Sequence, residues 1–408
     1  MNGRKRAHWG LTVGSASFVA LAIFGSLVST SGLIENIRAD LGLSYARGGL
    51  LLSAPFPVIV CFALLGGVLV DRLGARRMVA LGGAIALVAG GSRAWAESYW
   101  FLVAGTVLIG AGVGLIYPAL PKIVSAEAPA GKKEAGATLY TLGVMIGSSL
   151  GIGASHFMIP LMPLIPLAPG AGGWRGGFFG WTLILLAAFS LWFWVSSGGE
   201  EPEKTAAGGR EAAGAVAADG PGAFRRPGVW AVGCSLTVTN AIFYTCLGWL
   251  PALLSEKGWT PAAAITATSI VAWTGLPAAM SAYWLAPRVG GERRMVLVCI
   301  LATALSLAIL PSAGAWPAIA WTALFGFTLN YWFVFCLGYP ARSVPTGQAG
   351  RAAGVIFSLG YLGGFAGPWA AGAVRDAAGG FAPAFFGLAA AAALSALSTP
   401  WFGRQVSR

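Results

Sequence analysis

Acidic residues are scarce in this 408-residue chain and absent from the middle of its long apolar segments. The chain has 14 Asp and Glu residues against 26 Lys and Arg, and all 14 fall at the ends of apolar segments or between them. Charged residues make up 10% of the sequence, whereas a soluble domain carries about 25%. This composition argues against a soluble protein built around one very large core.

The residues that build enzyme and metal sites are also few. The five cysteines lie inside apolar segments without the spacing of a metal site or a disulfide framework. Two histidines and no embedded carboxylate do not supply the convergent acids and bases that catalysis needs. A GxxxxGK[ST] phosphate-binding loop is missing, so ATP is not the energy source. We therefore expect no enzyme, metal or cofactor, and keep a multi-span membrane enzyme or receptor-like protein as the alternative of a different class.

Long apolar runs are what the chain has instead, with 57% hydrophobic residues. A bilayer core about 30 Å thick needs about 20 apolar residues per helical span. The sequence predicts an all-α membrane protein whose twelve spans lie at about 10–34, 46–70, 77–95, 100–121, 135–158, 174–197, 228–254, 261–286, 294–312, 316–338, 350–374 and 380–403.

The basic residues collect in alternate connections between these spans. With the N-terminus in the cytoplasm, 20 of the 26 Lys and Arg fall on the cytoplasmic side, which follows the positive-inside rule. The net charge of +12 is thus a topology signal and does not indicate a nucleic-acid partner. We expect a multi-pass protein of the inner membrane, in contact with the bilayer, with both termini in the cytoplasm. The first apolar run is too long for a signal peptide and is interpreted as a retained helix.

The two halves of the chain resemble each other at a nearly constant offset in numbering. Thr141-Leu142-Gly143 matches Ser358-Leu359-Gly360, and Thr106 and Gly110 match Thr322 and Gly326. Between the halves lies a polar stretch rich in Gly, Ala, Glu and Pro. We predict two pseudo-symmetric six-helix bundles at 1–197 and 228–408, joined by a cytoplasmic linker at 198–227.

A motif between the second and third spans is more specific. The segment GGVLVDRLGARRMV, Gly66 to Val79, resembles the cytoplasmic signature of the major facilitator superfamily, with Ala75 where a basic residue is common. The second half contains a degenerate copy of this motif, APRVGGERRM from Ala286, which has Pro287 in place of the aspartate. The positions that match the signature are Gly67, Asp71, Arg72, Gly74, Arg76 and Arg77.

These residues suit a gate that closes in one state and opens in the other. A glycine at Gly67 lets two helices approach closely, and Gly74 makes the turn. Asp71 can accept hydrogen bonds from a neighbouring helix N-terminus and from the arginines. The alternative is an ordinary positively charged loop.

The resemblance implies that spans 1, 4, 7 and 10 line a central cavity and that the two halves rock about it. In span 7, Asn240 and Tyr244 share a helix face beside Phe243. A buried amide and phenol need partners, which a substrate or a neighbouring helix would supply. The other expected substrate-binding residues are Asn330 and Tyr331 in span 10, Tyr117 in span 4, Trp273 in span 8 and Tyr361 in span 11.

Two residues are candidates for coupling. His156 is the one imidazole at membrane depth, although a lone histidine is more often structural. Lys122 ends span 4, where it either gates the path of an anion or extends to water. The expected driving partner is a proton, a sodium ion or a counter-substrate.

The segment YTCLGWLPALLSEKGWTPAAA, Tyr244 to Ala264, resembles the cyanate/nitroimidazole-type branch of the superfamily. This resemblance implies a monomeric secondary transporter that moves a small organic solute, either an organic anion or an aromatic neutral compound, by rocker-switch alternating access. An aromatic cavity would also suit a quaternary amine through cation–π contacts, and this alternative remains open.

Overall fold

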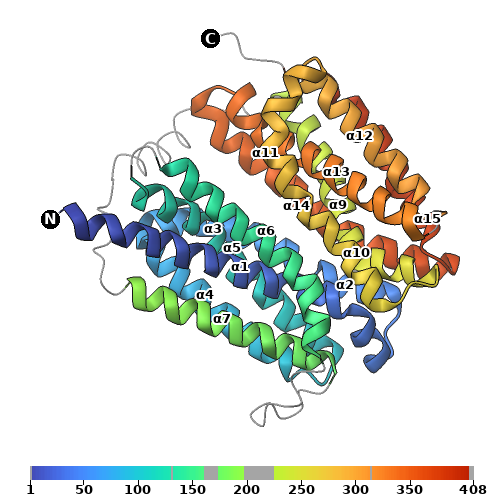
Figure 1. Cartoon of the computed structure of the whole chain (residues 1–408), viewed down its shortest axis with the longest axis horizontal. Helices are drawn as coiled ribbons and strands as arrows, with labels where there is room; N and C mark the ends of the chain where they lie inside the picture. The colour runs from blue at the N-terminus through green and yellow to red at the C-terminus, as the bar shows by residue number, and fades with distance from the viewer. Residues whose placement is uncertain (1, 130–131, 160–172, 197–224, 313–314, 404–408) are drawn as a thin grey trace. The chain divides into compact units, whose positions relative to one another are not determined.

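The computed structural model describes residues 2–129, 132–159, 173–196, 225–312 and 315–403, and all regular structure within them is helical (Figure 1). The contacts divide the chain into two compact units. Unit 1 contains residues 1–43 and 54–205, and unit 2 contains residues 44–53 and 206–408. A short segment of the N-terminal half, 44–53, thus packs with the C-terminal half. The predicted linker at 198–227 lies almost entirely outside the described residues.

Within the described residues, unit 1 contains six helices: α1 (Asn2–Leu41), α3 (Pro55–Leu73), α4 (Ala75–Ala94), α5 (Tyr99–Glu127), α6 (Lys133–Met158) and α7 (Trp174–Ser196). The described part of unit 2 contains α2 (Tyr45–Ser53), α9 (Pro227–Glu256), α10 (Pro261–Trp273), α11 (Gly275–Leu285), α12 (Glu292–Ile309), α13 (Ala315–Ser343), α14 (Thr346–Ala378) and α15 (Ala382–Ser395), with 3₁₀ turns at Ala286–Val289 and Ala396–Trp401.

Each predicted span corresponds to one helix or to a broken pair, which confirms the all-α membrane fold. Among the described residues, nine helices are long and apolar enough to cross a bilayer. The predicted spans 3, 9 and 11, now α4, α12 and α14, are not among these nine. Spans 2 and 8 are each interrupted, at Ala54 before Pro55 and at Thr274 before Pro277. Proline lacks the N–H that would continue the helical bonding.

The same close helix pair occurs in both units. In unit 1, α6 packs on α1, and a Cβ on Gly143 or Gly147 would collide with the backbone of Ser17 or Leu21. In unit 2, α14 packs on α9, where a Cβ on Gly363 would collide with the backbone of Thr237. Small residues are what allow membrane helices to pack this closely. The shared glycine pattern supports the predicted duplication.

The duplication extends to ion pairs, with their signs reversed. We call α1 and α9 the first helices of the two units, the end of each unit at which they begin the near end, and the opposite end the far end. At the near end of unit 1, Arg76 of α4 binds Glu127 of α5 at 2.8 Å. In unit 2, Glu292 of α12 binds Arg342 of α13, also at 2.8 Å. Arg76 and Glu292 occupy equivalent positions of the two halves. The ion pair is therefore present in both units, but the basic and acidic residues have exchanged places.

At the far ends, an acidic residue closes the first helix of each unit. Asp40 of α1 accepts hydrogen bonds from the Trp174 indole at 2.9 Å and from the Arg175 guanidinium at 3.1 Å, both at the start of α7. Glu256 of α9 stands at the equivalent position of the second half and accepts from the backbone N–H of Phe381, just before α15, at 3.3 Å. In both units this carboxylate ties the first helix to the last.

Candidate functional site

The predicted gating motif forms the sharp turn between α3 and α4. Gly74 has φ +93°, a conformation that favours glycine, and its N–H donates to the Val70 carbonyl at 3.1 Å. Arg76 binds Glu127, and Arg72 and Arg77 are exposed. The surroundings of Gly67 and Asp71 lie outside the described side chains, so the predicted role of Asp71 stays a prediction. The neighbouring Gly66 lies close to the Gly114 carbonyl of α5.

Two polar side chains of α9 have no hydrogen-bond partner among the described residues. Asn240 is only 6% exposed, yet its amide makes no hydrogen bond to any described residue. Gly360 of α14 faces this amide, and a Cβ there would lie 3.1 Å from Nδ2. Further along α9, the buried hydroxyl of Thr245 also has no partner among the described atoms. Such side chains are uncommon, because most buried polar groups are hydrogen-bonded.

Aromatic rings lie next to this amide along the helix. Phe243 and Tyr244 are half-buried, with ring centroids 5.2 Å apart in an edge-to-face arrangement. Tyr361, on the neighbouring helix α14, is also half-buried, while Trp273 at the end of α10 is 43% exposed.

The predicted pair in span 10 is placed differently. The Asn330 amide donates to the Val271 carbonyl of α10 at 3.0 Å and to the Gly326 carbonyl of its own helix at 2.8 Å. The Tyr331 hydroxyl lies 2.8 Å from the carbonyls of Ser281 and Ala282 in α11, and its side chain is fully buried. Both side chains therefore join α13 to the two pieces of the broken span 8, which is the helix-to-helix role rather than a free binding surface.

In unit 1, Tyr117 of α5 packs near an aromatic ring of α1. Its ring centroid is 6.0 Å from that of Phe24. Tyr117 precedes Pro118 and lies four residues before Pro121, so two backbone hydrogen bonds of α5 are missing here. Both rings are half-buried.

The two coupling candidates lie in different surroundings. His156 is half-buried in α6, and its Nδ1 is enclosed without a partner among the described atoms. The Phe157 ring stands edge-to-face beside it at 6.0 Å. Lys122 is exposed in the last part of α5.

The family of this chain is shown by comparison with known proteins. The model of the Major Facilitator Superfamily matches residues 15–368, which is most of the sequence. The chain belongs to the major facilitator superfamily. It is therefore a membrane transporter, and the resemblance inferred from the signature motif is confirmed.

Individual relatives of this superfamily member agree with that assignment. The 2-nitroimidazole transporter of Escherichia coli K12 is 26% identical over 397 residues, covering 95% of this chain and 94% of its own length. The inward-open xylose transporter of E. coli has a TM-score of 0.76 at 14% identity, over 98% of this chain and 97% of that one. A bacterial homologue of the human lysosomal transporter Spinster, in an inward-facing unoccupied state, has a TM-score of 0.75 at 15% identity and covers 98% of both chains. These structures establish the fold alone.

Several residues of this superfamily member were not anticipated from sequence. Glu127 pairs with Arg76 of the motif. Glu292 and Arg342 form the corresponding pair in unit 2, so the opposite charges at equivalent positions of the two halves were a signal for this pair. Arg93 is fully buried near the end of α4, where its guanidinium donates to the hydroxyl and carbonyl oxygens of Ser26 and lies 4.5 Å from the Phe178 ring. The sequence shows only that Arg93 lies at the end of an apolar segment. A basic residue at that place resembles a loop residue, so its burial was not predicted.

Proposed function

We propose that this transporter moves a small organic solute, aromatic and either uncharged or weakly anionic, across the cytoplasmic membrane by alternating access. The observation that carries the proposal is the buried Asn240 amide, which has no hydrogen-bond partner in the described structure. An amide without a partner in the protein offers both a donor and an acceptor to a polar edge of the substrate, and no existing hydrogen bond has to be broken.

The surroundings of Asn240 suit a flat solute. Phe243, Tyr244 and Tyr361 offer ring faces and a phenol, and Thr245 offers a hydroxyl. Aromatic pairs gain about 0.5–1.5 kcal/mol beyond simple burial. Together these groups would hold a heteroaromatic ring by stacking and by one or two hydrogen bonds. The relative that transports 2-nitroimidazole, a compound of this class, supports the same assignment.

Acidic residues do not contribute to this group. Among the described residues, Asp and Glu are found only near helix ends, in ion pairs such as Arg76–Glu127 and Glu292–Arg342. In this proposal recognition depends on an amide, hydroxyls and rings, so strongly cationic solutes lack a counter-charge. If a proton drives the transport, His156 is the group that would carry it, since its Nδ1 is enclosed and unpaired.

The proposed topology places both termini and the near ends of the units in the cytoplasm. The basic residues of the α3–α4 turn, Arg72, Arg76 and Arg77, lie at the near end of unit 1, and Arg288, Arg293 and Arg294 lie at the near end of unit 2. Their excess at these ends follows the positive-inside rule.

Uptake by purified protein in liposomes tests the function. We expect saturable accumulation of radiolabelled 2-nitroimidazole, inhibited by other small heteroaromatic compounds and not by D-xylose. A parallel thermal-shift series with organic acids, heteroaromatics and amines should show stabilisation by the transported class. Stabilisation by quaternary amines alone, with no uptake of any heteroaromatic or organic acid, would contradict the proposed substrate class.

A further inference from the structure

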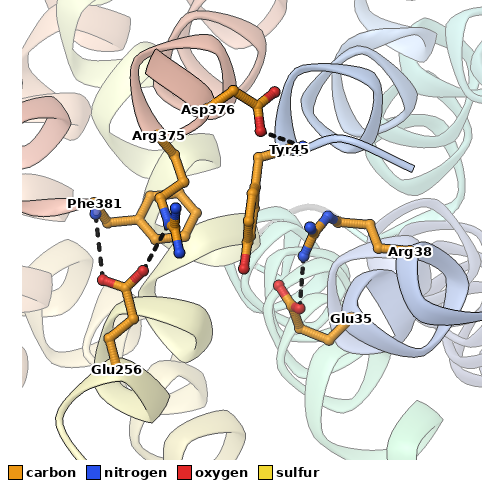
Figure 2. A network of polar contacts seen from close by, with 7 residues as sticks. All are labelled: Glu35, Arg38, Tyr45, Glu256, Arg375, Asp376 and Phe381. Carbon is orange, nitrogen blue, oxygen red and sulfur yellow. Dashed lines mark hydrogen bonds and ion pairs between the residues drawn. The ribbon is translucent and has the colours of Figure 1, made fainter. Parts of the chain in front are cut away.

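The short helix α2 is held in unit 2 by a carboxylate from another helix. Asp376, in the last turn of α14, accepts a hydrogen bond from the backbone N–H of Tyr45 at 2.9 Å (Figure 2). It also accepts one from the backbone N–H of Ala46 at 2.8 Å. These are the first two residues of α2, whose N–H groups have no partner within the helix. A carboxylate at a helix C-terminus opposes the dipole of its own helix, whereas at the N-terminus of α2 the helix dipole favours the negative charge of Asp376.

The ring of Tyr45 adds a second attachment. It lies edge-on to Phe381, with centroids 5.2 Å apart, and 5.6 Å from Trp249 of α9. The Arg375 guanidinium lies 4.6 Å from the Tyr45 ring centroid and donates to Glu256 at 2.7 Å, as Figure 2 shows. Tyr45 is therefore enclosed by groups from α9, α14 and the start of α15.

Glycines bring the backbones of α2 and α14 together. A Cβ on Gly372 would collide with the Tyr45 carbonyl, and one on Gly49 would collide with the Pro368 carbonyl. On α9, a Cβ on Gly248 would lie 2.5 Å from Leu52. With only nine residues, α2 is too short to be stable by itself and depends on this packing.

The equivalent helix of the second half, α10, begins without a carboxylate from another helix among the described residues. Ser44 and Thr260 occupy equivalent positions of the two halves, and each accepts a hydrogen bond at 3.3 Å from the N–H three positions on, at Arg47 and Ala263. The first residue of α2, Tyr45, has an N–H that donates to Asp376, whereas the first residue of α10 is Pro261, which has no N–H. In the described residues the Asp376 contact is thus an addition to the duplicated plan at α2.

A single residue separates α2 from unit 1. Ala54 lies between Ser53, the last residue of α2, and Pro55, the first residue of α3. Pro55 packs in unit 1, because a Cβ on Gly110 of α5 would lie 2.5 Å from its carbonyl. Pro55 and Pro57 also remove two backbone bonds at this junction, so the chain can bend here.

We propose that Asp376 is a positioning residue of the transport cycle, whose carboxylate holds α2 on unit 2 in the conformation described here and releases it in the opposite conformation. While the contact is made, residues 44–53 are bound to unit 2 and their covalent continuation belongs to unit 1. Release of α2 frees unit 1 to move, and the chain bends at Ala54 and Pro55, between α2 and α3. This inference rests on family membership and does not depend on the proposed substrate.

Two readouts on one set of variants test the proposal, in nanodiscs and in a background whose five cysteines are replaced by alanine. The first is the maleimide labelling rate of Ser53→Cys, because Ser53 is fully buried in α2. The second is the distance distribution between spin labels at Ala39→Cys and Lys257→Cys, measured by pulsed electron paramagnetic resonance. Asp376→Ala should raise the labelling rate about tenfold, since charge-assisted hydrogen bonds are lost, and should add a new distance population.

Matched variants separate the carboxylate from general damage. Asp376→Glu should restore both readouts in part, and Glu97→Gln, which removes an exposed charge elsewhere, should change neither. Gly372→Ala should act like Asp376→Ala because its Cβ would displace Tyr45, whereas Gly354→Ala on the same helix meets no atom within 4 Å and should be silent.

The outcomes that overturn the proposal are distinct. Unchanged labelling of Ser53→Cys in the Asp376→Ala protein would show that the carboxylate does not hold α2. Faster labelling with an unchanged distance distribution would mean that α2 frays locally and that its release is not linked to movement of the units. The solute-uptake experiment is independent of both readouts, so failure of one proposal is distinguishable from failure of the other.

Discussion

Two asparagines in unit 2 have the same side chain, nearly the same burial and opposite surroundings. Asn240 on α9 is 6% exposed and has no described hydrogen-bond partner, whereas Asn330 on α13 is 8% exposed and donates to two carbonyls. We infer from this difference that a buried amide in a membrane helix indicates a ligand site only when neighbouring helices leave it unpaired. Asn330 joins helices, and Asn240 is the residue that we propose for the solute.

Removal of the unpaired amide should have the largest effect on function. We expect Asn240→Ala to weaken solute uptake about tenfold, because a substrate hydrogen bond worth about 1.4 kcal/mol is lost. Initial uptake rates in liposomes over a range of 2-nitroimidazole concentrations measure this change. Wild-type kinetics in the Asn240→Ala protein would remove Asn240 from the site.

Removal of the paired amide should reduce stability. Asn330→Ala deletes bonds to Val271 and Gly326, and interhelical hydrogen bonds in membranes contribute about 0.6 kcal/mol on average. We expect about 1 kcal/mol of destabilisation, seen as a lower thermal midpoint in detergent. The control is Asn240→Ala, whose midpoint without ligand should match that of the wild type. An unchanged midpoint for Asn330→Ala would erase the contrast between the two asparagines.

The reversed ion pairs extend the comparison from two residues to two units. Arg76→Glu should destabilise unit 1 by about 0.5–1 kcal/mol, because the pair is exposed in part. The double variant Arg76→Glu with Glu127→Arg reproduces the charge order of Glu292 and Arg342 and should recover most of the loss. Thermal midpoints of the single and double variants measure the coupling, and a double variant no more stable than the single ones would argue against equivalence of the two pairs.

The smallest effect is expected at Tyr117. Its ring packs near Phe24, and Tyr117→Phe keeps this ring while removing the phenol. If unit 1 contributes stacking, Tyr117→Phe should leave the affinity for 2-nitroimidazole within about twofold, and Tyr117→Ala should lower it further. Equal losses in both variants would show that the hydroxyl matters and the ring does not.

Much of this architecture could be predicted from the sequence, because apolar run length and basic loops respond directly to the bilayer. The spans at 100–121 and 228–254 appear as α5 and α9, longer at both ends because helices continue beyond the hydrocarbon. The breaks at Ala54 and Thr274 went unpredicted, although Pro55 and Pro277 mark both positions. Proline is common enough in membrane helices that its presence alone does not locate a break.

The candidate site was harder to predict, since a pattern names polar residues and does not name their partners. Asn330 and Tyr331 resembled Asn240 and Tyr244 as polar and aromatic neighbours in a span, yet the carbonyls that engage them come from the two pieces of span 8, far away in sequence. The packing of α2 with unit 2 was hidden for the same reason, because its partner Asp376 lies in the other half of the chain. Tertiary pairing decides these roles.

The contrast between the two asparagines is tested by measuring binding and stability in the same three proteins. Wild type, Asn240→Ala and Asn330→Ala would be titrated with 2-nitroimidazole by calorimetry, with thermal midpoints recorded without ligand. We expect weaker binding with an unchanged midpoint for Asn240→Ala, and a lower midpoint with near wild-type binding for the folded Asn330→Ala. The reverse pattern, with binding lost only in Asn330→Ala, would place the solute on α13 and rule out the proposed role of Asn240.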